Sequence, residues 1–303
     1  MRIASLLPSA TEIVCGLGFE EQLVGRSHEC DFPLTVTSLP ALTEPKFDPE
    51  GSSAEVDQRV KKIVANALSV YRVDAAKLRE LHPDVIVTQS QCAVCAVSEP
   101  EVEAAVAQWI GAPPKIVSLS PNSLDDVLGD IERVARALGA AQRGVELAAQ
   151  IRTRMSAIAD KVRTAASRPS IAIIEWIDPM MAAGNWMPTL VEMAGGVNLF
   201  GKAGQHSPWM KFAELIAVDP DAIMISPCGF GLERTFREIP VLTRNPEWAR
   251  LKAVRSGRVY AADGNQYFNR PGPRIAESLE ILAEILHPEV FRFGHEGAGW
   301  RRV

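Results

Sequence analysis

Short apolar segments alternate with longer amphipathic segments along most of this chain, and this alternation limits the folds that it can adopt. "RIASLL" (2–7) precedes the helix-like segment "SATEIVCGLG" (9–18). "DVIVTQ" (84–89) precedes the helix-like segment "EVEAAVAQWIG" (101–111) in the same way. Strands that alternate with helices of ten or more residues form parallel sheets covered on both faces. We therefore predict an α/β fold with mainly parallel sheets.

One long helix interrupts the alternation over residues 140–167. Its apolar positions recur at spacings of three and four, which predicts a single amphipathic helix; they are Ala148, Ile151, Met155, Ile158 and Val162. "SIAIIEW" (170–176) then begins a second series of strands and helices. We predict an N-terminal lobe over 1–139, a connecting backbone helix over 140–167 and a C-terminal lobe over 168–303.

The second series repeats the first. "LRELHPDVIVTQSQC" ends at Cys92 and "LIAVDPDAIMISPC" ends at Cys228, and each combines a helix end, a Pro-Asp turn, a strand and a cysteine. This similarity predicts two lobes of similar build. Open parallel sheets bind ligands outside the carboxyl ends of their strands, so the predicted site is the cleft between the lobes.

Composition excludes several classes of partner. A net charge of −5 argues against nucleic acid, and no window approaches 18 consecutive apolar residues. Five cysteines, an odd number, and an N-terminus without a secretory signal pattern predict a cytoplasmic protein with free thiols. The alternative is a periplasmic or membrane-associated protein whose signal was removed. We expect a monomer.

The pair Cys92 and Cys95 forms the one CxxC motif of the sequence. Structural zinc sites need four ligands, and no second CxxC supplies them, although Cys30 and His28 are further candidates. A redox centre would place its first cysteine at a helix N-terminus, whereas the cap expected here is Ser98. The remaining interpretations are small buried thiols, or a Cys92 that lines the ligand site. No pattern of catalytic residues is evident, and we predict neither catalysis nor a resident cofactor.

The order of several segments resembles a known family. These segments are "LLPSATEIVCGLG", "LVGRSHECDFP", "LHPDVIV", "PMMAAGNWMPTLVEMAGGVNLF", "SPWMKFAEL", "DPDAIMIS" and "YFNRPGPRIAESLEILAEIL". Together they resemble the helical-backbone (class III) substrate-binding proteins of ABC importers, and most of all the vitamin B12-binding branch. The resemblance implies two α/β lobes joined by one rigid helix, and non-catalytic binding of cobalamin or a related corrinoid in the cleft between them.

The resemblance also implies particular site residues. Matching segment to segment gives ligand contacts at Glu29, Gln89, Gln91, Cys92, Met181, Trp209, Gln266, Tyr267, Phe268 and Arg270. Docking to an ABC permease would use one acidic residue on each lobe. Glu214 matches on the second lobe, whereas the first-lobe position falls near Ala76, with Asp74 close by.

Two other functions remain open at this level. The same fold could bind a ferric siderophore or haem, although a siderophore binder would be expected to hold more than the three tyrosines present. A protein of another class, a cytoplasmic metal-transfer protein or metalloenzyme, would use Cys92 and Cys95.

Overall fold

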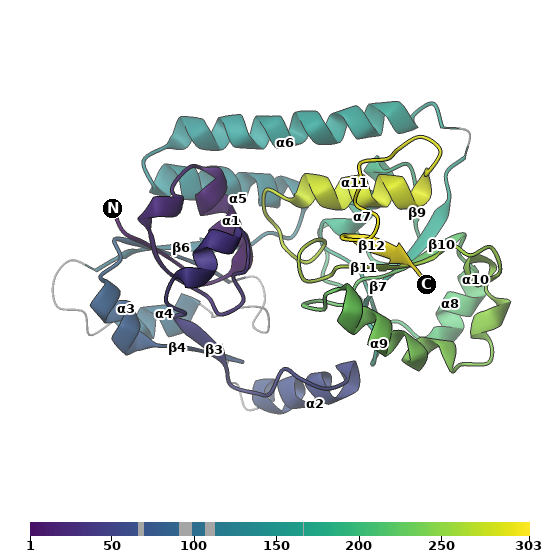
Figure 1. Ribbon diagram of the computed structural model, residues 1–303, viewed down its shortest axis with the longest axis horizontal. Coiled ribbons are helices and arrows are strands. Elements are labelled where there is room, and N and C mark those ends of the chain that lie inside the picture. Colours follow the sequence, from purple (N-terminus) through teal and green to yellow (C-terminus); the bar gives the residue numbers. More distant parts are fainter. Residues whose placement is uncertain (66–69, 91–98, 107–112, 166) are drawn as a thin grey trace. The chain divides into compact units, whose positions relative to one another are not determined.

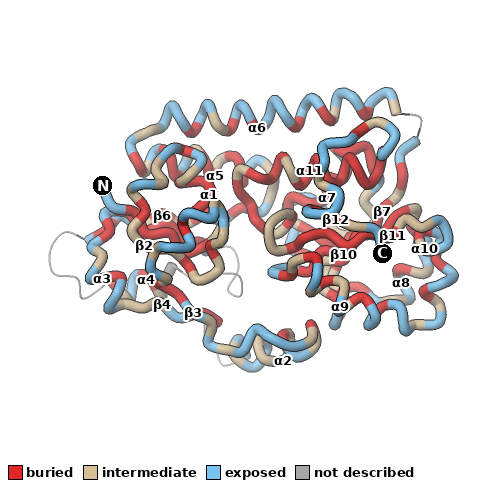
Figure 2. Tube along the Cα trace, in the orientation of Figure 1, coloured by how far each residue is buried: buried red, intermediate tan, exposed pale blue. Residues whose placement is uncertain are grey.

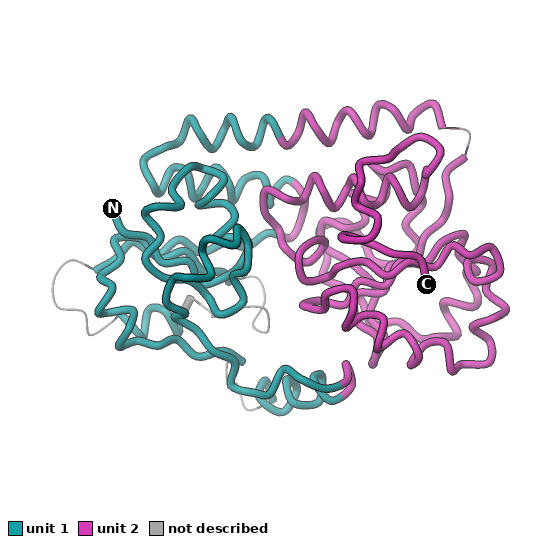
Figure 3. Tube along the Cα trace, in the orientation of Figure 1, with its two compact units in different colours: residues 1–51, 55–121, 125–150 teal, residues 52–54, 122–124, 151–303 magenta. Residues whose placement is uncertain are grey.

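The computed structural model describes residues 1–65, 70–90, 99–106, 113–165 and 167–303. These residues form two compact units (Figure 3). Unit 1 comprises residues 1–51, 55–121 and 125–150, and unit 2 comprises residues 52–54, 122–124 and 151–303. Gln91, Cys92, Cys95 and Ser98 lie outside the described residues.

A four-stranded parallel sheet forms the centre of unit 1. Its strands are β1 (Ile3–Ser5), β2 (Leu23–Arg26), β5 (Val85–Gln89) and β6 (Lys115–Leu119), in the order β2-β1-β5-β6. All five residues of β5 are buried. Its apolar sequence, which does not alternate, is what a strand covered on both faces requires.

Helices and a small second sheet accompany this sheet. The helices are α1 (Pro8–Gly16), α2 (Ser53–Val64), α3 (Ala75–Leu81), α4 (Glu99–Val106) and α5 (Leu124–Ala137), with 3-10 turns η1 (Glu20–Gln22) and η2 (Leu34–Ser38). The small sheet pairs β3 (Thr43–Pro45) antiparallel with β4 (Tyr71–Val73), and α2 lies between these two strands in the sequence. Leu42, Leu78, Ile86 and Val102 pack together in the core of the unit.

Unit 2 contains a six-stranded mixed sheet. Its strands are β7 (Ser170–Trp176), β8 (Met181–Ala182), β9 (Val197–Asn198), β10 (Ala222–Ile225), β11 (Val259–Ala262) and β12 (Trp300–Arg302). The order is β12-β11-β10-β7-β8, with β9 also paired to β7. The outer strands β8 and β12 are antiparallel to their neighbours, and the other pairs are parallel.

The helices of unit 2 pack on this sheet. They are α7 (Met187–Met193), α8 (Phe212–Val218), α9 (Leu232–Thr243), α10 (Lys252–Arg255) and α11 (Ile275–Leu286), with the 3-10 turn η3 (Trp248–Arg250). Every residue of α11 except Glu277 is buried. This burial explains why its sequence is apolar on nearly all sides.

The two units repeat one strand order, and Figure 1 labels the four parallel strands of this order in unit 2, β7, β9, β10 and β11. Unit 1 has β2-β1-β5-β6, and the parallel strands of unit 2 follow the matching order β9-β7-β10-β11. In both units a seven-residue helix ends at a left-handed residue, His82 or Asp219, and a Pro-Asp pair leads into the third strand. The predicted similarity of the two series is thereby confirmed.

The long helix is α6 (Ala141–Val162), and it runs without interruption from unit 1 into unit 2. The five apolar positions of the predicted seam are all buried, while much of the rest of the helix is exposed (Figure 2). The α/β class with mainly parallel sheets and one long helix is therefore confirmed. Among the described helices, none is both long and apolar enough to cross a membrane.

Separate contacts anchor each half of α6. In unit 1, Arg143 donates to the carbonyl oxygen of Leu17 (3.2 Å) and its guanidinium lies 5.3 Å from the ring centre of Phe19. In unit 2, Arg154 donates two hydrogen bonds to the buried carboxylate of Glu280, at 2.6 and 2.7 Å. Charge-assisted paired bonds of this kind are the stronger ones.

Candidate ligand-binding site

The carboxyl ends of the parallel strands are where this topology places a ligand. In each sheet the first strand of the chain lies between the second and the third, so the connections that follow the first and the second strand run to opposite sides. The place where the strand order reverses, the topological switch point, lies between β1 and β5 in unit 1 and between β7 and β10 in unit 2.

Glu29 and Tyr71 meet near the carboxyl end of β2 in unit 1. The Tyr71 hydroxyl donates to Glu29 Oε1 (3.1 Å), and the Tyr71 ring is buried. Glu29 is half-buried and lies three residues beyond the end of β2. Its carboxylate therefore remains at the strand edge while the tyrosine holds its position.

His28 lies beside this pair. Its Nδ1 is 2.8 Å from Thr43 Oγ1, its ring centre is 5.3 Å from that of Tyr71, and its backbone N–H also donates to Thr43 Oγ1 (3.1 Å). Burial lowers the pKa of His28 from its usual value, and the nearby Arg26 lowers it further. The imidazole is therefore held in one place and neutral at pH 7.

Gln89 ends β5 and is 95% buried, so its amide contributes little open surface at this edge. The Pro-Asp turns also set the register between the repeats: counted from Asp84 and Asp221, Cys228 corresponds to Gln91 rather than to Cys92. The assumed equivalence of the two cysteines is therefore wrong by one residue. The predicted contacts of Gln91 and Cys92 lie outside the described residues.

Two other thiols in unit 1 are not poised for chemistry. Cys30 is buried, and the Thr11 hydroxyl donates to its sulfur (3.0 Å). Burial raises the pKa of Cys15 to about 12, and nearby carboxylates add to the effect. Such thiols stay protonated at neutral pH. Within the described residues, no group of three or more His, Cys, Asp or Glu side chains is placed to hold a metal ion.

Trp209 presents the largest aromatic surface at the corresponding edge of unit 2. Its backbone forms an antiparallel bridge with Met181, the first residue of β8, and its side chain is 58% exposed. Neighbouring bonds from Ala182 N to Pro208 O and from Met210 N to Met180 O, both 2.9 Å, hold the two segments together. A tryptophan on fixed backbone is thus left open to solvent.

Glu175 is a residue at this edge that the sequence reasoning missed. It is the penultimate residue of β7, and the Ser207 hydroxyl donates to its Oε1 (2.9 Å). Burial raises its pKa to about 7, against the opposing effect of that bond. A carboxyl placed at the end of the apolar strand "SIAIIEW" was the available signal, because a charge is costly in such a position.

The segment 266–270 divides into exposed and buried positions. Gln266 and Tyr267 are half-buried, and Gln266 Oε1 accepts from Arg274 (3.1 Å). Phe268 is 99% buried, its N–H donates to Ser278 Oγ (3.0 Å) and its carbonyl accepts from Trp186 (2.8 Å). Arg270 is buried as well and donates to Asn265 (3.1 Å). Phe268 and Arg270 are therefore buried within unit 2, and their predicted contacts with a ligand stay predictions.

The predicted docking carboxylates both lie at helix starts. Glu214 is exposed in the first turn of α8, and its carboxylate accepts from the N–H of Lys211 (2.6 Å). Asp74 caps α3 and accepts from the N–H of Lys77 (3.0 Å), while Ala76 is exposed beside it. The bond from Lys77 lowers the pKa of Asp74. Each unit thus presents one carboxylate at the start of the repeated helix.

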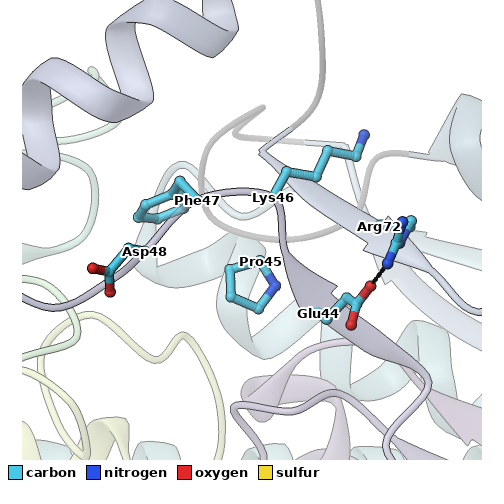
Figure 4. A pocket seen from close by; sticks show the side chains of 6 residues that line it. All are labelled: Glu44, Pro45, Lys46, Phe47, Asp48 and Arg72. Atoms are coloured by element: carbon cyan, nitrogen blue, oxygen red, sulfur yellow. Dashed lines mark hydrogen bonds and ion pairs between the residues drawn. The ribbon is translucent and has the colours of Figure 1, made fainter.

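A shallow pocket of about 480 Å³ lies beside the small β3-β4 sheet of unit 1 (Figure 4). Its lining residues are Glu44, Pro45, Lys46, Phe47, Asp48 and Arg72. Glu44 on β3 and Arg72 on β4 form an ion pair, and both side chains are more than half exposed. None of the predicted ligand contacts lines this pocket, which is charged and open rather than apolar.

Known proteins resemble the chain over nearly its full length. A lipoprotein of Bacillus subtilis, named an uncharacterized ABC transporter substrate-binding lipoprotein, is 23% identical over 96% of this chain and 81% of its own length. The vitamin B12-binding protein of Vibrio cholerae is 23% identical over 94% of this chain and 88% of its own. The structure of a periplasmic heme-binding protein from Roseiflexus, 24% identical, covers 95% of this chain and 98% of its own with a TM-score of 0.69.

These comparisons also bear on location and on catalysis. Members of the family to which the relatives belong are periplasmic or lipoprotein solute-binding proteins, so the prediction of a cytoplasmic protein finds no support and its alternative is favoured. Solute binding without catalysis agrees with the absence of a catalytic pattern in the sequence. The model of one family, described as periplasmic binding protein, matches residues 3–265. The chain therefore belongs to the periplasmic binding protein family.

Proposed function

We propose that this protein binds cobalamin or a related corrinoid outside the cytoplasm, as the substrate-binding component of an ABC importer. The observation that carries the proposal is Trp209, whose side chain is 58% exposed on backbone fixed to Met181 at the carboxyl edge of its sheet. A flat macrocycle gains affinity from such aromatic surface with few hydrogen bonds. The vitamin B12-binding relatives support the same ligand class.

Polar side chains at the strand edges suit the amide groups around a corrin ring. Glu29 is held by Tyr71, and Gln266 is held by Arg274, so that each presents an oriented polar group. Fixed partners reduce the conformational entropy lost on binding. We propose Glu29, Gln89, Met181, Trp209, Gln266 and Tyr267 as the ligand contacts among the described residues. The cleft predicted between the lobes stays a prediction.

Haem is the second candidate, because a solved structure of the same fold is named a periplasmic heme-binding protein. The tyrosines argue against a phenolate ligand to iron. Tyr71 and Tyr260 are buried, and Tyr267 is half-buried. None of the three tyrosines is therefore fully exposed to haem iron or to an anionic ferric siderophore.

Docking on the permease would use the exposed carboxylates at the starts of α3 and α8. We assign Glu214 in unit 2 and Asp74 in unit 1 to this role. Asp74 is the N-cap of α3 and Glu214 lies in the first turn of α8, so each unit has a carboxylate near the start of a repeated helix. Replacing either residue should weaken stimulation of the permease ATPase without changing ligand affinity.

Equilibrium titration of the purified protein tests the ligand class. We expect cyanocobalamin and hydroxocobalamin to bind with a saturating change in the visible spectrum at micromolar protein, and hemin and a ferric siderophore to bind more weakly. Saturable binding of hemin or the siderophore without binding of either corrinoid would overturn the proposal.

A further inference from the structure

His28 is positioned more firmly than a hydrogen-bonding surface residue needs. It lies two residues beyond β2, at the same edge as the ends of β1 and β5. Thr43, the first residue of β3, holds both its backbone N–H and its ring Nδ1. The buried ring of Tyr71, the first residue of β4, packs against the imidazole. Both strands of the small β3-β4 sheet therefore contact this side chain.

The hydrogen bonds also select one tautomer. The Thr43 hydroxyl donates to Ser27 Oγ (2.9 Å), so its lone pairs are left to accept from His28. Nδ1 then carries the proton and Nε2 carries the lone pair. Over the part of the chain that the structure describes, Nε2 has no hydrogen bond of its own. Burial and Arg26 favour the neutral ring, which is the form that can bind a metal.

This arrangement is the one that histidine metal ligands use. A ligating imidazole commonly donates its second N–H to a neighbouring oxygen, which fixes both tautomer and ring orientation. Here Thr43 is that neighbour. Within the described residues, no cluster of three metal-binding side chains lies around His28. A tetrapyrrole brings four in-plane nitrogens and leaves its axial positions for other ligands.

We propose that His28 Nε2 is an axial ligand to the central metal of the bound tetrapyrrole, an inference that rests on the proposed function. At neutral pH the upper axial position of cobalt(III) in hydroxocobalamin can hold an exchangeable water, and this aqua form is the one that reacts. The bond from cobalt to that water breaks, the water leaves with both of its protons, and the Nε2 lone pair forms the new bond. No electron is transferred, and cobalt remains in its trivalent state.

A comparison of cyanocobalamin with hydroxocobalamin distinguishes coordination of cobalt by His28 from binding without coordination. Cyanide holds the upper position of cyanocobalamin tightly, so cyanocobalamin binds without the contribution of His28. We expect the native protein to shift the visible bands of hydroxocobalamin to those of its complex with free imidazole. His28→Ala should abolish that shift and lower hydroxocobalamin affinity by about 10-fold or more, a clearly larger loss than for cyanocobalamin.

Further variants test the support and the fold. Thr43→Val keeps the size of the side chain but removes its hydroxyl, and it should weaken hydroxocobalamin binding with part of the spectral shift retained. His28→Gln serves as a second variant if His28→Ala unfolds. His82→Asn, at an exposed histidine with a positive φ that asparagine tolerates, is the matched control and should change neither affinity nor spectrum.

The outcomes separate the inference from the proposed function. If both corrinoids bind and His28→Ala leaves the spectrum and both affinities unchanged, the inference is wrong and the corrinoid function stands. If neither corrinoid binds, the proposed function is wrong and hemin becomes the probe. Histidine-ligated haem that loses this ligation in His28→Ala then supports the inference for iron, and hemin binding that is independent of His28, or no binding, overturns it.

Discussion

The two units share one strand order but differ in the chemistry at the carboxyl edges of their sheets. Unit 1 gathers polar groups there: Glu29 and His28 are held by the buried Tyr71 and Thr43, and Gln89 is itself buried. Unit 2 presents the exposed Trp209 and the half-buried Glu175. The comparison teaches that the repeated scaffold fixes where a ligand can be met, whereas the loops that follow the strands decide what each unit contributes.

The loops differ because each unit adds different elements to the shared order. Unit 1 adds the small β3-β4 sheet. Thr43, the first residue of β3, positions His28, and Tyr71, the first residue of β4, positions Glu29. Unit 2 adds β8, whose first residue Met181 pairs with Trp209. The added elements orient His28, Glu29 and Trp209, whereas Gln89 lies on the common sheet. Substitutions at these contacts should therefore alter binding more than stability.

The largest expected effect is on the aromatic edge. Trp209→Ala should weaken cyanocobalamin binding by roughly 30-fold, about 2 kcal/mol, because a large exposed aromatic anchor is removed. Gln89→Ala should weaken it by about 5-fold, the loss of one hydrogen bond. Titration calorimetry measures both. Phe293→Ala removes another partly exposed aromatic of unit 2 and should have no effect. An equal loss in the Trp209 and Gln89 variants would contradict the division between the edges.

Glu175 should make the stability of unit 2 depend on pH. Its folded-state pKa of about 7 lies above the ordinary 4.5, so the folded protein holds a proton that the unfolded chain releases. Stability should fall as the pH rises from 4.5 to 7, by about 1–3 kcal/mol at full ionisation. Denaturant unfolding of the native protein and of Glu175→Gln at several pH values measures the difference.

The corresponding test in unit 1 is Asp130, where burial raises the pKa to about 6. Asp130→Asn should reduce the fall in stability between pH 3.8 and 6, an interval that begins below that of Glu175 and overlaps it. If neither variant changes the dependence of unfolding free energy on pH, the two carboxyls are ionised in the folded protein and this part of the account is wrong.

The two anchors of α6 should differ in strength. Arg154→Met should lower the free energy of unfolding by about 2 kcal/mol, because it removes two charge-assisted bonds and leaves Glu280 buried beside His295. Arg143→Met removes one bond to a carbonyl and should cost about 1 kcal/mol or less. Urea unfolding ranks the two variants, and a larger loss for Arg143→Met would reverse the comparison.

The two repeated Pro-Asp turns should also differ in strength, and the weaker of them carries the smallest expected effect. Asp221 accepts from the N–H and hydroxyl of Ser170, both at 2.8 Å, and from Lys252, which together with these bonds holds its pKa at about 2. Asp221→Ala should cost about 1–2 kcal/mol at pH 7, stability that the native protein loses as the pH falls from 3.8 toward 2.

The matched variant at the other turn is Asp84→Ala. Asp84 accepts from the N–H of Arg2 (2.7 Å) but is 61% exposed, so its removal should cost about 0.5 kcal/mol. Thermal unfolding of both variants at pH 7 compares the turns. Similar losses would show that exposure does not weaken the bond of Asp84.

Periodicity was sufficient to predict most of the scaffold. The buried seam of α6 and the apolar strand β5 follow directly from patterns of three or four residues and from an unbroken apolar run. The short strands β8 and β9 have two residues each, too few to leave a periodic pattern. β12 depends on pairing with β11, a contact between distant parts of the sequence.

The site was harder to predict than the fold. Trp209 stood out because a large aromatic lies in a loop with Gly and Pro, but the aromatic Phe268 is buried although it is next to the half-buried Tyr267. Its positive φ of 57° and its bonds to Ser278 and Trp186 turn it inward, and no local pattern reveals such contacts. The bond between Thr43 and the His28 ring likewise depends on the pairing of β3 with β4, which come from separate segments of the sequence.

Titration calorimetry with cyanocobalamin and hemin, each added to the same preparation of the native protein, tests the central claim most directly. The account predicts saturating heat with cyanocobalamin at micromolar concentrations, lost or strongly reduced in Trp209→Ala, and weaker binding of hemin. Tight binding of hemin with no heat from cyanocobalamin would contradict it.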